Sequence, residues 1–176
     1  MKAKKITQKE LYALVTAEPS GVSLQPIASL KWDVAILVPD CSGGKNRFTR
    51  SVADYVDDPS KKAAFLHAIS HLFHALSEEN YQAVLSNSAV ACKSARTFKF
   101  EGSTHKLWEL KPNNKDRIYF YGVTDMKPPN RKTIFLLMVF HKKDKTTPDT
   151  AGAPCEDAIK DIIRAKGMID FCKEKK

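Results

Sequence analysis

The chain has 176 residues, of which 43% are hydrophobic and 28% are charged. This length suits one domain, and this balance is typical of a globular protein and not of a disordered chain. No apolar run approaches the roughly 20 residues that cross a bilayer, and the N-terminus has no apolar stretch of signal-peptide length. We therefore expect a packed, cytoplasmic protein with no membrane partner.

The formal net charge of +9 is concentrated in the second half of the chain. Residues 1–90 contain 10 Lys and Arg against 9 Asp and Glu, whereas residues 91–176 contain 19 against 11, which gives +1 and +8. A positive surface attracts polyanions, above all nucleic acid, because phosphates bound by Lys and Arg release their counterions. The alternative is a basic surface that serves only solubility.

The first half of the chain predicts helices around one strand. Thr7 is a suitable N-cap for a short helix, with Glu10 in the capping-box position. The apolar, β-branched run at 32–39 predicts a buried strand. A helix with one apolar face is predicted at 61–76, and a second helical segment at 81–85 would fold back on it as a hairpin.

After Thr97 the hydrophobic pattern changes to that of strands. Segments at 106–111, 117–123 and 133–140 are joined by short links rich in Pro and Asn, which predicts an antiparallel meander. A last helix is predicted to begin near Pro154, with apolar residues at helical spacing.

Four cysteines occur, at positions 41, 92, 155 and 172, and their spacing is far from the CxxC pairs of structural zinc sites. We expect free thiols and no disulfide, because the chain has no secretion signal. His67, His71 and His74 fall opposite the apolar face of their helix, so an exposed polar face is the expectation and a metal site the alternative. No Gly-rich phosphate loop is recognised, and no cofactor is expected.

Two groups of residues suggest RNA binding. Alternation along 117–123 places Arg117, Tyr119 and Tyr121 on one face of a strand. Arginine binds phosphate bidentately, and tyrosine rings stack on bases. In the alternative interpretation, Arg117 pairs with Glu109 across the sheet and both residues are scaffold.

The second group is the basic segment HKKDKTTP at 141–148, which follows the most apolar strand. Lys142, Lys143 and Lys145 at the end of a strand would hold a phosphate backbone without reading its sequence. Lys111, at the end of another strand, would join the same surface. A solvated basic loop is the alternative.

Four sequence blocks resemble a known family. LWELK (107–111), DRIYF (116–120), FLLMVFHKKDKTTP (135–148) and the following helix start are similar to the LWELR, YRILY, LLHGFxKKxxKTP and EIxxA blocks of the phage-derived HigB branch of the RelE superfamily of toxins. The resemblance covers 106 to about 166, and more weakly the chain back to 32. It implies an α+β, RelE-like fold over 31–176, with a helical hairpin packed on a small antiparallel sheet and a C-terminal helix. Residues 1–30 would be an extension of unknown role.

The resemblance also implies a function. The protein would be an endoribonuclease toxin that cuts mRNA on the ribosome and is silenced by a helix-turn-helix antitoxin. In this family basic residues on the sheet hold the scissile phosphate while the RNA's own 2′-OH attacks it, without a metal, and fixed cations stabilise the phosphorane. Carried onto this chain, the catalytic positions are Lys111, Arg117, Lys143 and His141, and the RNA-binding positions are Lys142, Lys145, Tyr119 and Tyr121.

This chain departs from the family pattern at three places. Met138 replaces the histidine of LLHGF, Val139 replaces its glycine, and no tyrosine follows Tyr121. A non-catalytic RNA- or ribosome-binding protein is therefore a second hypothesis. A third is a phage-encoded protein that binds a host protein through its N-terminal half.

Overall fold

The structure is a computed structural model that describes residues 1–17, 29–42, 44–126, 131–143, 146–165 and 168–173. These residues form a seven-stranded sheet with the order β3-β4-β5-β6-β2-β1-β7. Neighbours from β3 to β6 are antiparallel, as are β2 and β1, whereas β2 is parallel to β6 and β7 is parallel to β1. The strands are β1 (Lys2–Lys5), β2 (Asp33–Val38), β3 (Ala91–Phe100), β4 (Ser103–Lys111), β5 (Asp116–Met126), β6 (Arg131–His141) and β7 (Asp170–Phe171).

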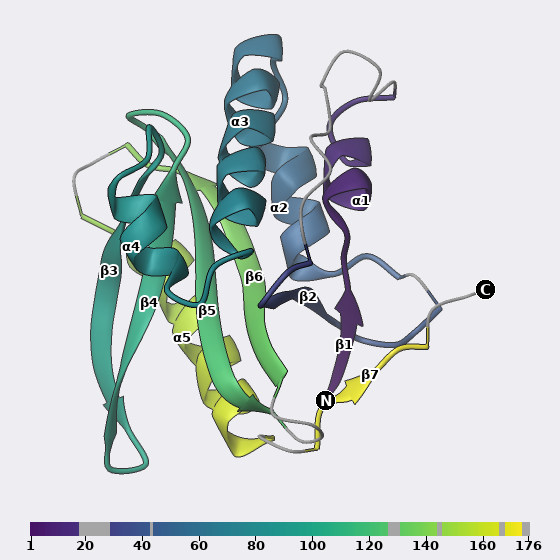
Figure 1. The fold of residues 1–176 in the computed structure, drawn as a ribbon, viewed down its shortest axis with the longest axis vertical. Helices are drawn as coiled ribbons and strands as arrows, with labels where there is room; N and C mark the ends of the chain where they lie inside the picture. Colours follow the sequence, from purple (N-terminus) through teal and green to yellow (C-terminus); the bar gives the residue numbers. More distant parts are fainter. Residues whose placement is uncertain (18–28, 43, 127–130, 144–145, 166–167, 174–176) are drawn as a thin grey trace.

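Helices cover both faces of this sheet (Figure 1). One face, here called the α3 face, packs against α1 (Gln8–Ala13), α2 (Arg47–Tyr55), α3 (Pro59–Ala75) and α4 (Tyr81–Ser86). The opposite face, the α5 face, packs against α5 (Asp149–Arg164). Along β5, Ile118 and Phe120 belong to the core of the α3 face and Tyr119 to that of the α5 face, as strand alternation requires.

The expected fold class, a helical hairpin on a small antiparallel sheet, is wrong. The sheet is larger and mixed, because β2 pairs in parallel with β6 and then adds β1 and β7 on its other side. The added strands carry little sequence signal: β1 has the sequence KAKK with Ala3 as its one buried residue, and β7 has two residues. Pairing with β2 therefore decides the structure of β1 more than its own hydrophobic pattern does.

Several local predictions are confirmed. Thr7 and Glu10 form a capping box at the start of α1. The run at 32–39 contains β2, and the predicted meander corresponds to the antiparallel strands β4, β5 and β6. The residues before α1 and the helix itself belong to the domain core, since Ala3, Leu11 and Tyr12 are fully buried.

The expectation of four free thiols is wrong. Cys41 and Cys172 form a disulfide between residues 131 positions apart, whose Cα atoms lie 5.4 Å from each other. The sheet brings them together, because Cys41 follows β2, Cys172 follows β7, and β1 alone separates these two strands. Cys92 and Cys155 are free, and burial raises the pKa of each thiol to about 12. None of the helices in the described ranges has the length and apolar character needed to cross a membrane.

Candidate functional site: a buried glutamate among cations

Glu109 of β4 is fully buried and is surrounded by cationic side chains. Its Oε1 atom lies 3.4 Å from Nε of Arg117 and 3.7 Å from Nζ of Lys93, and its Oε2 atom lies 3.7 Å from Nζ of Lys142. These distances are longer than those of hydrogen-bonded ion pairs, about 2.7–2.9 Å. The carboxylate is thus compensated electrostatically without being tightly held.

Strand register explains why these residues meet. Lys93 of β3 is directly opposite Glu109, and on the other side Glu109 is opposite Tyr119 of β5. Arg117 precedes Tyr119 by two residues and therefore projects from the same face, the α5 face. Lys142 follows β6, where its backbone N–H donates a hydrogen bond to the carbonyl oxygen of Lys115 (2.8 Å).

Lys111 interacts electrostatically with this group, so four cations share one carboxylate and the local charge is 4 − 1 = +3. We call Lys93, Glu109, Lys111, Arg117 and Lys142 the Glu109 cluster. Burial lowers the pKa of Lys111, and the charges of Lys93 and Arg117 lower it further. Burial also lowers the pKa of Lys142, against the attraction of Glu109. The cluster is therefore short of negative charge.

Several buried polar atoms in the cluster have no hydrogen-bond partner among the described residues. They are both carboxylate oxygens of Glu109 and Nε of Arg117. The hydroxyl of Tyr119, which adjoins the cluster, lies beside Thr147. Burial raises the pKa of Tyr119 to about 12. Since buried polar groups in folded proteins are nearly always hydrogen-bonded, these atoms make the cluster a candidate for a functional site.

The terminal nitrogens of Arg117, in contrast, are bonded to the backbone. Nη1 donates to the carbonyl oxygens of Asn113 (3.0 Å) and Asp116 (2.7 Å), and Nη2 donates to that of Asn114 (3.0 Å). These bonds hold the β4–β5 turn and fix the guanidinium beside Glu109. Arg117 thus contributes positive charge to the cluster, while most of its donors are already used.

A pocket of about 240 Å³ opens onto the cluster. Besides Lys93, Glu109 and Lys142, it is lined by Ser94 and Ala95 of β3 and by Thr146 and Thr147 before α5. The register of β3 against β4 shifts between Ser94 and Arg96, and such bulges often adjoin active sites. The pocket, which we call the Glu109 pocket, is smaller than the roughly 300–1,000 Å³ of drug-sized ligand sites and suits a small anionic group.

Arg96 forms hydrogen bonds with residues at the start of α5, beside this pocket. Its guanidinium donates to Asp149 (2.5 Å), to Glu156 (3.1 Å) and to the carbonyl oxygen of Thr147 (2.9 Å). Gly152 leaves the space for it, because a Cβ atom at that position would lie 2.2 Å from the guanidinium carbon. Arg96 therefore positions the wall of the pocket that Thr146 and Thr147 form.

The structure brings together only some of the residues predicted from the sequence. Lys111, Arg117 and Lys142 lie in the Glu109 cluster, and Tyr119 adjoins it. The alternative in which Arg117 pairs with Glu109 is observed as an ion pair. Lys143 is exposed, and Lys145 lies outside the described residues.

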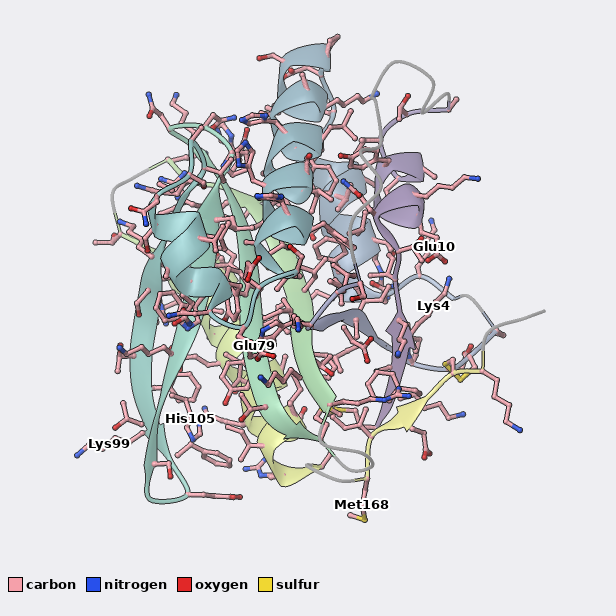
Figure 2. The ribbon with its side chains drawn as sticks, in the orientation of Figure 1. Lys4, Glu10, Glu79, Lys99, His105 and Met168 are labelled. Carbon is pink, nitrogen blue, oxygen red and sulfur yellow. A yellow bond between two sulfur atoms is a disulfide. The ribbon has the colours of Figure 1, made fainter. Side chains whose placement is uncertain are left out.

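His141 and Tyr121 are placed elsewhere. Nδ1 of His141 lies 2.7 Å from Oδ1 of Asp116, and Asp116 interacts with Lys61 of α3, so this pair occupies the α3 face. The hydroxyl of Tyr121 lies 3.0 Å from Nδ1 of His105. His105 is close to the β3–β4 hairpin, as Figure 2 shows, and that hairpin is at the far end of β4 from Lys111.

Sequence reasoning missed the centre of this site. Glu109 was expected only as a structural partner of Arg117, and Lys93 was not singled out. The strand β3 begins at Ala91, whereas the strand pattern in the sequence is clear only after Thr97, so the register that places Lys93 opposite Glu109 was not accessible. A charged residue between Trp108 and Leu110 in an otherwise apolar strand was the available signal.

The histidines of α3 lie apart from this site, and the rings of His67 and His71 are 4.4 Å apart. Within the described ranges, no group of three or more His, Cys, Asp or Glu side chains is arranged to hold a metal ion. Comparison of the chain with known proteins gave no match to a family model, to a curated protein or to a solved structure.

Proposed function

We propose that this protein binds RNA at the Glu109 cluster and cleaves it, acting on mRNA at the ribosome as the sequence resemblance implies. The observation that carries the proposal is the charge of the cluster: four cations share one buried carboxylate beside a pocket of phosphate size. A phosphodiester in the pocket would compensate the excess positive charge and supply acceptors for the lysine ammonium groups.

The same residues supply the groups that 2′-OH attack requires. Glu109 accepts the proton of the 2′-OH, the O2′–P bond forms, and the P–O5′ bond breaks to leave a 2′,3′-cyclic phosphate. Lys142 donates a proton to the departing 5′ oxygen, and its lowered pKa makes it a better acid than an ordinary lysine. Lys93, Lys111 and Arg117 stabilise the charge of the phosphorane. The 3.7 Å separation of Lys142 and Glu109 lets the proton return between them.

A ribosome-dependent toxin that an antitoxin silences is the biological role that fits this chemistry and the resemblance. The resemblance covers four of the residues that line the Glu109 pocket, namely Glu109 of β4, Lys142 after β6, and Thr146 and Thr147 before α5, whereas Lys93, Ser94 and Ala95 of β3 lie outside it. The overall sheet, in contrast, differs from the one that the resemblance implied. The proposal therefore rests on the local site and not on the architecture.

A second candidate is a protein that binds RNA or the ribosome without cutting it. Two observations favour it: the terminal nitrogens of Arg117 are occupied by carbonyl oxygens, and His141 lies on the opposite face of the sheet from Glu109. Binding would need only the positive charge of the lysines, whereas catalysis also needs Lys142 to act as a proton donor.

Mapping of RNA 5′ ends after in vitro translation with the purified protein separates these candidates. We expect new 5′ ends in translated mRNA with the wild type and far fewer with Lys93→Gln, because that lysine lines the pocket and is half-exposed, so its replacement should not impair folding. Lys9→Gln, an exposed residue of α1, is the matched control. Intact transcripts together with ribosome binding would support the non-catalytic candidate, and intact transcripts without RNA or ribosome binding would refute both.

A further inference from the structure

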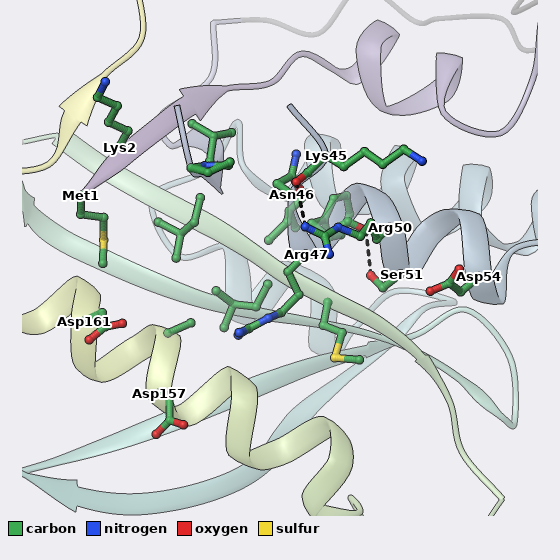
Figure 3. A pocket seen from close by; sticks show the side chains of 18 of the residues that line it. Met1, Lys2, Lys45, Asn46, Arg47, Arg50, Ser51, Asp54, Asp157 and Asp161 are labelled. Atoms are coloured by element: carbon green, nitrogen blue, oxygen red, sulfur yellow. Dashed lines mark hydrogen bonds between the residues drawn. The ribbon is translucent and has the colours of Figure 1, made fainter. Parts of the chain in front are cut away.

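A second, larger cavity lies where the parallel strands β2 and β6 separate. Figure 3 shows the side chains that line it. The two strands pair as far as Ile36 and Leu136. Beyond that point α2 replaces β2 beside β6, and the Ser51 hydroxyl of α2 accepts a hydrogen bond from the backbone N–H of Val139 (2.8 Å). The divergence leaves a cavity of about 810 Å³, which we call the switch cavity.

The topology of the sheet singles out this position. The chain leaves β2 for α2 on the α3 face and leaves β6 for α5 on the opposite face. In open α/β sheets, a crevice forms outside the carboxyl ends of adjacent parallel strands whose helices go to opposite faces, and ligands bind there. The volume falls within the roughly 300–1,000 Å³ of sites for organic ligands. Among the described residues, none lines both this cavity and the Glu109 pocket.

The floor of the switch cavity is apolar. Leu37 and Val38 at the end of β2 and Leu136 and Met138 of β6 line it, and Tyr55 of α2 adds an aromatic ring. An uncharged apolar surface of this kind can pack against the flat apolar part of a ligand. A bare inorganic ion would leave most of it uncovered.

The α2 wall is cationic. Lys45 and Arg47 flank the N-cap Asn46, Arg50 follows within the next turn, and the first turn has no acidic residue. Cations are unfavourable at the start of a helix, where the helix dipole is positive. Arg47 spans the cavity, as Figure 3 shows, and donates to the carbonyl oxygen of Pro154 in α5 (2.5 Å). Arg50 and Lys45 also line the cavity, where Nη2 of Arg50 donates to the carbonyl oxygen of Lys45 (3.1 Å), and Asp54 is the one acidic residue that α2 contributes to the lining.

The opposite wall is a strip of α5 that presents Asp157 and Asp161. Each carboxylate has a cationic neighbour on α5, at 3.4 Å from Lys160 and 3.5 Å from Arg164. Carboxylates compensated in this way accept hydrogen bonds from hydroxyl groups, as acidic residues do from ribose in dinucleotide-binding sites. The two walls are thus suited to opposite ends of one polar ligand.

We propose that the switch cavity is a binding site for a nucleotide-sized organic anion, with the chemistry of a nucleoside monophosphate. The phosphate contacts Lys45 and Arg50, the sugar hydroxyls face Asp157 and Asp161, and the base lies on the apolar floor. This site is separate from the RNA site proposed at Glu109.

Isothermal titration of the full chain with AMP, inorganic phosphate and adenosine tests this assignment. We expect AMP to bind, and phosphate and adenosine each to bind far more weakly, because each lacks part of the contact surface. Arg50→Gln and Lys45→Gln should each weaken AMP binding by about tenfold, the loss expected for a charge-assisted hydrogen bond. Lys9→Gln, a cation away from the cavity, should leave the affinity unchanged.

The variant Lys93→Gln distinguishes the switch cavity from the Glu109 pocket. If AMP occupies the switch cavity, its affinity is the same in Lys93→Gln as in the wild type. The proposal is overturned if AMP does not bind, if phosphate alone binds as tightly as AMP, or if Lys93→Gln weakens AMP binding while Arg50→Gln does not.

Discussion

The Nε atom of Arg117 lies 3.4 Å from Oε1 of Glu109, and both side chains are buried between the sheet and the start of α5. A buried ion pair adds little to stability by itself, since desolvation offsets much of the attraction. Removing one partner, however, leaves the other charged and uncompensated. Around Glu109 this effect is amplified, because the same carboxylate compensates Lys93 and Lys142 as well.

We predict that Glu109→Gln lowers the free energy of unfolding by about 3–5 kcal/mol, the cost of breaking a buried pair. Urea denaturation followed by circular dichroism measures it. Glu78→Gln removes an exposed carboxylate next to α3 and should cost less than about 0.5 kcal/mol. Equal stability of these two variants would show that Glu109 does not hold the cluster together.

Gly152→Ala should disturb the wall of the Glu109 pocket through Arg96. The new Cβ would overlap the guanidinium, which must move and lose its contacts with Asp149 and Glu156. We expect a loss of about 1–3 kcal/mol in stability, typical of overpacking, together with reduced RNA cleavage. In a double-mutant cycle, Arg96→Ala should remove most of this loss, whereas additive effects would contradict the proposed contact.

The affinity for RNA should begin to fall at a lower alkaline pH than it would if all the bound lysines had the pKa of exposed lysines. The pKa values of Lys111 and Lys142 lie below the usual lysine value of 10.5, chiefly because of burial, so these side chains lose their charge at lower pH than exposed lysines do. Fluorescence anisotropy of single-stranded RNA measured between about pH 7.5 and pH 10 should show a steady loss of affinity. The Lys111→Arg variant should retain more affinity at the alkaline end, since arginine stays charged. An identical decline in both proteins would count against a role for Lys111.

The folded state should be less stable at acidic pH, and His71 should be one cause. Burial lowers its pKa below 6.5, and the nearby imidazoles of His67 and His74 lower it further. Between the folded-state pKa and 6.5 the unfolded chain binds more protons than the folded one, so stability rises with pH through this window and is lost as the pH falls through it. The urea midpoint should be lower at about pH 5 than at about pH 7.5, and this difference should be smaller in His71→Gln than in the wild type. An equal difference in both proteins would show that His71 does not cause the loss of stability in acid.

The elements that sequence could predict are those with a strong pattern of their own. The apolar run of β2 and the apolar face of α3 are patterns within the segments themselves, and α3 spans Pro59–Ala75 where the sequence predicts a helix at 61–76. The helix α2 was missed, although Phe48, Val52 and Val56 recur at helical spacing and are buried. This spacing is a signal that the sequence does contain.

Other elements had no such signal. The helix α5 begins at Asp149 and contains Pro154 in its interior, whereas proline favours the first helical turn, so the predicted start was five residues late. The disulfide between Cys41 and Cys172 depends on the placement of β7 beside β1. Because β7 has only two residues, its sequence pattern is too short to predict that pairing. Site residues on separate strands, such as Lys93 and Glu109, require the register between those strands, and their own sequence does not contain it.

RNA binding by this protein depends, in our proposal, on the positive charge of the Glu109 cluster, and the salt dependence of RNA binding measures whether that charge holds the RNA. Each phosphate contact contributes about 0.7 to the slope of log affinity against log salt for a single strand. The double variant Lys93→Gln/Lys111→Gln should therefore bind single-stranded RNA more weakly, with a slope smaller by about 1.4, while Lys9→Gln/Lys31→Gln, which removes two exposed cations elsewhere, should behave as the wild type does. Equal affinity and equal slope in all three proteins would contradict the claim that RNA phosphate is held at Glu109.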